Sequence, residues 1–242
     1  MDDELDQLLR SLKLSRIREI LDERLATATA EGLAYSELLR RLLREEHHAQ
    51  QIRFLEFRIE RAQIPERWPL ETFPWDRQPG VHRAQIEQLA NLDFVGTATN
   101  LVFVGPTGVG KTGIASGILL RALFAGRRGQ FVKAQNLFDD LFRSLADHSS
   151  RKLLDRFMRV EVLLIDELGY LNLRPDQSNI FFKLMEERYM RRLCTMITTN
   201  LDYDEWYSFL GQKAMVAALL DRLRHRCVTL RIDGPSLRVP AA

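Results

Sequence analysis

The stretch LVFVGPTGVGKT, residues 101–112, decides the fold class of this chain. Its first part, LVFV, is continuously apolar, as expected of a strand buried in a parallel sheet. The segment GPTGVGKT at 105–112 follows directly and fits the phosphate-loop pattern G-x-x-x-x-G-K-[ST]. A helix is predicted over 112–124, so strand, loop and helix occur in the order that the motif requires.

The residue types of this loop are those that bind a triphosphate. Its glycines take backbone conformations that other residues resist, and successive N–H groups then form a cradle for anions. Lys111 is expected to reach the β- and γ-phosphates, and Thr112 to offer its hydroxyl to Mg²⁺. We therefore predict ATP and Mg²⁺ as ligands. The predicted ATP-binding residues of the loop are Gly105, Pro106, Thr107, Gly108, Val109, Gly110, Lys111 and Thr112.

A second part of the same site is predicted in VLLIDEL, residues 162–168. The apolar run indicates a buried strand over 160–166, and Asp166 is expected at its carboxyl end, where open α/β sheets bind ligands. An ionised carboxylate there is costly unless it meets a cation, so we expect Asp166 and Thr112 to hold Mg²⁺ together. Glu167 is then placed to polarise a water molecule that attacks the γ-phosphate.

Short apolar runs alternate with helical patterns throughout the second half of the chain. The expected strands cover 101–105, 130–134, 160–166, 193–200 and 227–232. The expected helices cover 112–124, 135–145, 152–158, 176–191 and 214–223. Alternation of this kind implies a parallel sheet covered on both faces, so we predict an α/β fold with the three-layer α/β/α arrangement of P-loop NTPases.

The beginning of the chain has a different character. Apolar residues recur at helical spacing over 1–64, which predicts an all-helical domain of about three helices with a solvated, charged surface. Residues 65–99 start with a segment rich in proline and tryptophan, which blocks helix formation, and we predict a joint followed by a helix over 83–92. The ATPase core is predicted over 100–242.

Two further residues are candidates for work on the γ-phosphate. Asn200 ends the strand segment ITTN at 197–200, and its amide is expected to hold the attacking water or a phosphate oxygen, unless it only favours the turn. Arg222 follows an apolar helical face in LLDRLRHRC at 219–227. An arginine stabilises the charge on a transferring phosphoryl group, whereas the other interpretation is a surface arginine paired with Asp221.

Composition and charge restrict the class of protein. The hydrophobic share of 45% and the charged share of 28% are ordinary for a soluble protein, and no run approaches the ~20 apolar residues of a membrane span. The acidic start lacks the layout of a signal peptide, so we expect a cytoplasmic protein. Cys194 and Cys227 are expected to be free thiols, since too few ligands surround them for a zinc site.

Basic residues suggest one surface for DNA. Arg151, Lys152, Arg156 and Arg159 fall near one face of a predicted helix, a pattern that suits contacts to DNA phosphates without sequence reading. Ordinary solvated charge is the alternative, because the net charge is only +2. No helix-turn-helix or zinc-finger pattern indicates base-specific recognition, so we expect non-specific binding to duplex DNA.

The order of the motifs resembles a known family. GPTGVGKT, LLIDELGYL, ITTN, LLDRLRHRC and GPSLR follow one another as in the AAA+ ATPases of the IstB/DnaC group, and most closely as in the IstB-type helper ATPases of bacterial insertion sequences. The resemblance covers nearly the whole chain. It implies an AAA+ core that assembles with ATP into a higher oligomer on duplex DNA and delivers a partner transposase to target DNA.

The resemblance also implies roles for single residues. Asn200 matches the sensor-1 position, and Arg222 matches an arginine finger acting on a neighbouring subunit. Arg238, in GPSLR, is implied to sense nucleotide, although the family usually has GESYR there. Gly113 replaces a common histidine, and TTN replaces TSN. Only ten residues follow Ile232, so we expect no full helical lid.

Other functions share these motifs. A DnaC/DnaI-like loader of the replicative helicase has the same ATPase residues but a different partner, and it is expected to prefer single-stranded DNA. A small-molecule kinase uses the same phosphate loop, but it needs an acceptor pocket and a lid with several arginines. A scaffold that binds nucleotide without hydrolysing it is a further alternative, and the presence of Glu167 disfavours it. The leading prediction is therefore a DNA-transposition helper that hydrolyses ATP.

Overall fold

The computed structural model of the protein describes residues 2–169, 173 and 175–238. The chain divides into two compact units, Met1–Phe57 and Arg58–Ala242. We keep the division into 1–64, 65–99 and 100–242 as a proposal based on the sequence. No helix in the described ranges is long and apolar enough to cross a membrane.

The first unit is helical and has a small core of its own. Its helices are α1 (Asp3–Ser11), α2 (Ser15–Glu31) and the first part of α3 (Tyr35–Ala62). Leucine and isoleucine side chains pack between them, among them Ile17, Ile20 and Leu42. The buried carboxylate of Glu46 accepts a hydrogen bond over 2.9 Å from the N–H of Ile17, which satisfies a free amide in the first turn of α2.

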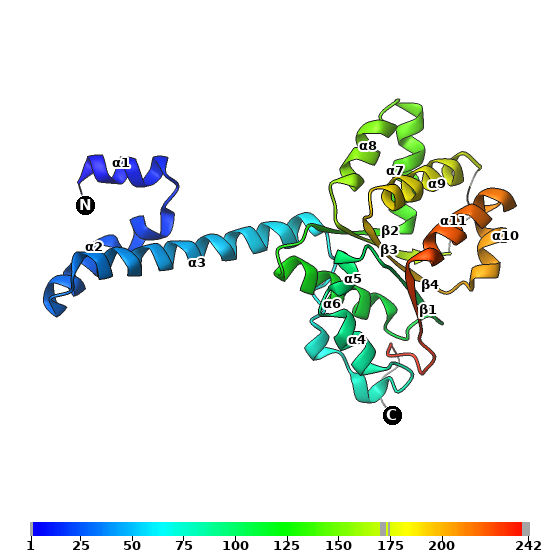
Figure 1. Ribbon diagram of the computed structural model, residues 1–242, viewed down its shortest axis with the longest axis horizontal. Helices are drawn as coiled ribbons and strands as arrows, with labels where there is room; N and C mark the ends of the chain where they lie inside the picture. Colours follow the sequence, from blue (N-terminus) through cyan, green and yellow to red (C-terminus); the bar gives the residue numbers. More distant parts are fainter. Residues whose placement is uncertain (1, 170–172, 174, 239–242) are drawn as a thin grey trace. The chain divides into compact units, whose positions relative to one another are not determined.

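The second unit is built on a parallel sheet of five strands, arranged in the order β2-β3-β4-β1-β5 (Figure 1). The strands are β1 (Asn100–Val104), β2 (Gly129–Lys133), β3 (Val162–Leu168), β4 (Cys194–Thr199) and β5 (Cys227–Arg231). Every pair of neighbours is parallel. The chain passes from β1 to β2 at one edge of the sheet, returns through β3 and β4, and then reaches β5 on the other side of β1. Open α/β sheets bind ligands at such a point, where the strand order reverses.

Helices cover both faces of this sheet, which confirms the predicted α/β fold. They are α4 (Arg83–Leu89), α5 (Asp93–Gly96), α6 (Lys111–Phe124), α7 (Ala134–Ala146), α8 (Ser150–Met158), α9 (Pro175–Met190), α10 (Trp206–Leu210) and α11 (Lys213–His225). Alternate residues of each strand point to opposite faces, as a period of two demands. Leu163 and Ile165 pack with α7 to α11, whereas Val162 and Leu164 pack with α4 and α6.

The joint between the two predicted domains is an ordered part of the second unit. Two short 3₁₀ turns, η1 (Leu70–Thr72) and η2 (Trp75–Arg77), place Leu70 and Phe73 in the core beside α6. This close packing depends on glycine, because a Cβ on Gly117 of α6 would lie 2.6 Å from the side chain of Leu70. The joint therefore forms a wall against the helix that follows the phosphate loop.

One strand end differs from the sequence prediction. The strand predicted over 160–166 is β3, Val162–Leu168, so Asp166 lies within the strand and not at its end. A shift of register between Ile165 and Leu168 marks a bulge, and Glu167 has a φ of +61° there. A positive φ is unfavourable for a residue with a side chain, and the sequence pattern carries no signal for it.

Candidate active site

The predicted phosphate loop borders a cavity of about 700 Å³ in the second unit. The cavity lies where β1, β3 and β4 end and where α6 begins. Its lining includes Lys111, Thr112, Asp166 and Glu167, which come from sequence segments about 55 residues apart. The helix contributes the positive end of its dipole and its free N–H groups, so the position favours an anion.

The loop keeps the conformation that its glycines permit. Gly108 and Gly110 have φ values of +89° and +95°. A Cβ on Gly110 would lie 2.8 Å from the ring of Phe73, and a Cβ on Gly108 would collide with the side chain of Ser236. Both positions therefore require glycine for backbone and packing reasons together. Val109 points away from the cavity into the core and is 1% exposed.

The side chain of Lys111 is folded back onto the loop. Its Nζ donates hydrogen bonds to the carbonyl oxygens of Gly105 and Pro106 over 2.8 and 2.7 Å. Burial lowers the pKa of Lys111, the nearby carboxylate of Asp166 raises it in part, and the charge of Arg238 lowers it further. Among the described residues, the hydrogen-bond acceptors of this ammonium are uncharged carbonyl oxygens, so phosphate oxygens would be better partners for it.

Asp166 is held by two hydroxyl groups. Thr112 Oγ1 donates to Asp166 Oδ1 over 2.8 Å, and Thr198 Oγ1 donates to the same oxygen over 2.6 Å. Asp166 is 2% exposed, and burial raises its pKa, an effect that the two hydrogen bonds partly oppose. The structure therefore brings Thr112 and Asp166 into direct contact, as the prediction of a shared metal site requires.

These oxygen atoms fit a magnesium ion. Mg²⁺ prefers a few protein oxygens, including one or two carboxylates, together with substrate phosphates and water. The hydroxyl of Thr112 and the carboxylate of Asp166 are such ligands, and they lie next to the phosphate loop. A cation here would also offset the cost of the buried carboxylate.

Glu167 is oriented by the bulge in β3. Its N–H donates to Thr198 Oγ1 over 2.9 Å, so Thr198 holds both carboxylate residues of the strand. The side chain of Glu167 is 46% exposed and its Oε2 lies 3.9 Å from Nζ of Lys133. The unusual backbone directs this side chain to the cavity, where a solvated carboxylate can act on a water molecule.

An aromatic wall from the joint forms another side of the cavity. Trp68, Phe73 and Pro74 line it, together with the charged side chain of Arg77. Trp68 is 41% exposed, although it belongs to a segment that otherwise packs on α6. Apolar rings beside a phosphate loop provide a surface on which a flat base can stack.

Arg238 also lies at this cavity. The tail that follows β5 crosses the loop, and the N–H of Leu237 donates to the carbonyl oxygen of Gly108 over 2.9 Å. Leu237 and Arg238 both line the cavity, and the charge of Arg238 acts on Lys111. The structure thus brings Arg238 to the same cavity as the phosphate loop.

Asn200 is not among the described residues that line the cavity. β4 ends at Thr199, and Asn200 is exposed. A Cβ on Gly169 would lie 3.0 Å from its Oδ1, so the amide is close to the chain that follows β3. Its sensor role stays a prediction, while Thr198 and Thr199 of the same strand do line the cavity.

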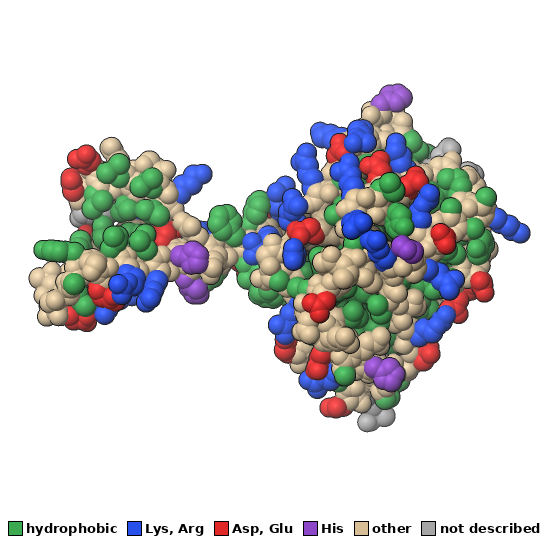
Figure 2. Space-filling view, in the orientation of Figure 1, with side chains coloured by type: hydrophobic (Ala, Val, Ile, Leu, Met, Phe, Trp, Pro, Cys, Tyr) green, Lys and Arg blue, Asp and Glu red, His purple; other side chains and the backbone are tan. Residues whose placement is uncertain are grey.

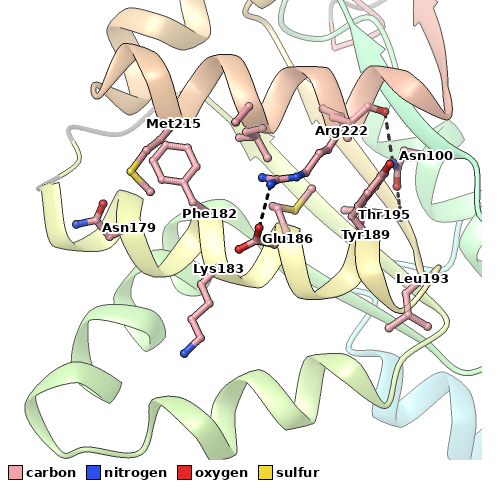
Figure 3. A pocket seen from close by; sticks show the side chains of 14 residues that line it. Asn100, Asn179, Phe182, Lys183, Glu186, Tyr189, Leu193, Thr195, Met215 and Arg222 are labelled. Atoms are coloured by element: carbon pink, nitrogen blue, oxygen red, sulfur yellow. Dashed lines mark hydrogen bonds and ion pairs between the residues drawn. The ribbon is translucent and has the colours of Figure 1, made fainter.

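Arg222 lies at a different cavity, of about 430 Å³, between α9 and α11. Figure 3 shows its side chain extending from α11 toward Glu186 on α9, with Phe182 and Met215 beside it. Arg222 Nη2 lies 3.0 Å from Glu186 Oε1, so its partner is Glu186 and not Asp221. The structure does not bring Arg222 to the phosphate loop of its own chain.

The basic residues predicted to contact DNA lie on and after α8. Arg151, Lys152, Arg156 and Arg159 are all exposed. Arg151 pairs with Asp155 over 3.3 Å, whereas Lys152 and Arg159 have no ion pair to any residue that the structure describes. Figure 2 shows Lys and Arg side chains gathered over this part of the second unit, with acidic residues between them.

Comparison with known proteins identifies the family. The family model described as IstB-like ATP binding protein matches residues 7–241. The chain belongs to this family. The IstB-like chain is 32% identical over 236 residues to the ATP-binding protein of insertion sequence IS21 from Pseudomonas aeruginosa, covering 98% of this chain and 89% of that one. It is 33% identical over 212 residues to that of IS5376 from Geobacillus stearothermophilus, covering 88% and 84%.

Solved structures confirm the AAA+ type of fold in the IstB-like chain. The DnaC helicase loader is 25% identical with a TM-score of 0.54, covering 62% of this chain and 88% of that one. DnaI is 26% identical with a TM-score of 0.53, covering 62% and 85%. DnaA bound to AMPPCP and single-stranded DNA, at 15% identity and a TM-score of 0.57 over 69% and 50%, shares the fold. The IstB-like chain is thus an ATP-binding P-loop protein and an ATPase.

Sequence reasoning missed two residues of this site. Thr198 lies within ITTN, where the pattern points to the last residue of the segment, although any hydroxyl near the end of a central strand is a candidate. Lys133 is the second residue that the sequence pattern did not indicate. It ends β2, whose register pairs it with Asp166 on β3, and strand ends in a parallel sheet meet at one edge.

Proposed function

We propose that this ATPase is the ATP-dependent helper of a DDE-type transposase: it assembles on duplex DNA when ATP is bound, and hydrolysis resets the assembly. The observation that supports this most is the match to insertion-sequence proteins over nearly the whole chain, combined with the hydrogen bond from Thr112, at the end of the phosphate loop, to Asp166 within β3. The helical first unit is included in the match, so the similarity extends beyond the nucleotide site.

Each residue of the site has its own role in the proposed hydrolysis. Lys111 and the loop amides hold the triphosphate, and Thr112 and Asp166 would hold Mg²⁺. The bound metal would neutralise phosphate charge as the reaction proceeds. Glu167 takes the proton from a water molecule whose oxygen bonds to the γ-phosphorus, while the bond to the β–γ bridging oxygen breaks and ADP leaves. Trp68, which is 41% exposed, offers a stacking surface for the base.

Arg222 completes the site from a neighbouring subunit in this proposal. On its own chain it lies at a separate cavity, whose described lining shares no residue with that of the phosphate-loop cavity. An arginine supplied in trans would make hydrolysis depend on assembly. Glu186, its partner in the single chain, would have to release it.

Duplex DNA is proposed to bind along α8. Lys152 and Arg159 are free of ion pairs within the described chain, so their charges are available to phosphates. Two such contacts should contribute about two units to the slope of log affinity against log salt concentration. Non-specific binding of this kind suits a helper that accepts many target sequences.

The test measures ATP hydrolysis without DNA, with duplex and with single strands. We expect stimulation by duplex, and for Lys152→Ala/Arg159→Ala a weaker duplex affinity and a salt slope smaller by about two. Lys13→Ala/Arg44→Ala removes the same charge at exposed positions that likewise have no ion pair to a described residue, and it should change neither. Recruitment is tested by co-sedimentation of a purified transposase with the chain on duplex DNA, expected only with ATP.

A helicase loader is the second candidate, and the similarity to the DnaC helicase loader is the observation that favours it. That similarity covers 62% of this chain, whereas the insertion-sequence relatives cover 88–98%. Hydrolysis stimulated by single strands alone, with no effect of duplex, would support the loader and contradict the proposed transposition function.

A further inference from the structure

Gln78 joins three segments of the second unit that are far apart in sequence. It lies between η2 and α4 and is 1% exposed. Its Nε2 donates to the carbonyl oxygen of Val109 over 2.9 Å and to that of Pro235 over 3.1 Å. Its Oε1 is buried and has no hydrogen-bond partner among the described residues. This buried amide uses its two donor hydrogens, while its acceptor has no partner among the described residues. The hydrogen bonds that it donates are therefore the ones that matter for the structure.

The carbonyl groups of two consecutive loop residues are held by groups outside the loop. Gln78 holds the carbonyl of Val109, and the N–H of Leu237 holds the carbonyl of Gly108 over 2.9 Å. Gln78 belongs to the joint, and Leu237 belongs to the tail after β5. The tail itself is tied to the joint, since Pro235 also accepts from Gln78.

The geometry of the peptide bond determines where the N–H that follows each of these carbonyl groups points. In a trans peptide the C=O and the N–H that follows it point in opposite directions. A carbonyl of Val109 fixed toward Gln78 therefore directs the N–H of Gly110 away from Gln78. Gly110 lines the cavity and Gln78 is not among the described residues that do. Within the described chain, the N–H groups of Val109 and Gly110 have no backbone acceptor.

We propose that Gln78 is a positioning residue of the phosphate loop: by holding the carbonyl of Val109 from outside, it aims the N–H of Gly110 at the phosphates. The inference rests on the proposed ATP site and goes beyond it, because it gives the joint a role in binding. The backbone N–H of Leu237 holds the neighbouring carbonyl of Gly108, which fixes the preceding peptide group of the loop. The loop is thus held by the side chain of Gln78 and by the tail together, which lowers the ordering cost of binding.

Gln78→Met tests this proposal, because methionine has a similar length and no donor. We expect the dissociation constants of Mg·ATP and of Mg·tripolyphosphate to rise by the same factor, roughly three- to tenfold, the effect of losing one neutral hydrogen bond. Tripolyphosphate has no base, so an equal loss places the effect at the phosphates. Calorimetric titration separates this from misfolding, which lowers the number of sites and not their affinity.

Two control variants complete the comparison. Gln85→Met changes an exposed glutamine of α4 and should leave both constants unchanged. Ile86→Val removes one methyl group from a buried residue of the same helix, so it should lower the melting temperature without changing the constants. Unchanged affinity in folded Gln78→Met, or a loss as large in Ile86→Val, would overturn the role of Gln78. No binding by the wild-type chain would instead overturn the ATP site itself.

A measurement on the wild-type chain covers the case in which Gln78→Met does not fold. Labelling valine at the carbonyl carbon and glycine at nitrogen gives amide signals from the Val–Gly pairs only, at Gly96, Gly105 and Gly110. We expect the Gly110 amide proton to move strongly downfield with Mg·ADP, while the Gly96 signal stays in place. A Gly110 signal that does not respond to bound Mg·ADP would contradict the proposal.

Discussion

The hydroxyl of Thr198 donates a hydrogen bond over 2.6 Å to Oδ1 of Asp166, which lies on the neighbouring strand. The same hydroxyl accepts the N–H of Glu167 over 2.9 Å. One threonine therefore fixes the proposed metal ligand and the backbone of the proposed general base. It is 0% exposed, so this arrangement does not depend on solvent.

Thr198→Val replaces the hydroxyl by a methyl group of nearly the same size. We expect the hydrolysis rate to fall roughly 10- to 100-fold, the usual effect of losing a group that orients a metal ligand, while ATP affinity changes less than about threefold. Thr198→Ser keeps the hydroxyl and should retain most of the rate. A Val variant that hydrolyses ATP at the wild-type rate would show that Thr198 has only a packing role.

Glu167→Gln separates binding from hydrolysis. The amide keeps the size of the side chain but cannot accept the proton of the attacking water, so we expect a loss of at least about 100-fold in turnover. Mg·ATP should bind as tightly as before, because the loop and Asp166 are unchanged. Turnover and calorimetric affinity are measured on the same sample, and turnover close to that of the wild type would assign the base to another residue.

The proposed action of Arg222 in trans is tested by mixing two inactive variants. Lys111→Ala cannot bind ATP but supplies Arg222, and Arg222→Ala binds ATP but lacks the finger. A mixed oligomer contains some complete sites, so we expect hydrolysis to reappear on mixing with DNA present. Each variant alone serves as the control. Two inactive variants that stay inactive when mixed, although they co-assemble, would contradict the role in trans.

Glu46 makes the stability of the helical unit depend on pH. Burial acts to raise its pKa, but hydrogen bonds from the N–H of Ile17 and from Arg53 outweigh this, so the pKa lies below its ordinary 4.5. The ionised form therefore stabilises the fold above about pH 4.5, and this contribution is lost as the pH falls through the pKa in the folded state.

Glu46→Gln should lower the free energy of unfolding at pH 7 by about 1 kcal/mol, the scale of a hydrogen bond to a charged group discounted for an exposed partner. The difference from the wild type should shrink as the pH falls below about 4.5. Urea unfolding followed by circular dichroism at several pH values measures it. A difference that stays constant down to pH 3 would contradict the role of the charge.

The sheet and the phosphate loop were predictable because both follow from local pattern. The apolar run at 101–104 and the glycines at 105–110 specify a strand and a turn wherever they occur. Asp166 could be placed near Thr112 because the carboxyl ends of parallel strands share one edge, although β3 continues to Leu168, two residues beyond Asp166. These predictions need no knowledge of distant contacts.

The remaining features depend on tertiary contacts and could not be predicted. The positive φ of Glu167 arises in a bulge of β3 that the residue types of this segment do not predict. The alternative interpretation of Arg222 paired it with Asp221, but its ion pair is with Glu186 on α9, because α9 and α11 pack side by side. The sequence pattern does not distinguish Gln78 from the other polar residues of the joint, and only the fold brings it to Val109.

The central claim is that one cavity holds ATP between the loop at 105–112 and Asp166 with Mg²⁺. Calorimetric titration of ATP into the full chain, with Mg²⁺ and with EDTA, tests it most directly when Lys111→Ala and Asp166→Asn are titrated beside the wild type. The account predicts binding by the wild type that is tighter with Mg²⁺, a loss of binding in Lys111→Ala, and binding in Asp166→Asn that Mg²⁺ no longer strengthens. Equal affinity for Mg·ATP in all three proteins, or no affinity in the wild type, would contradict it.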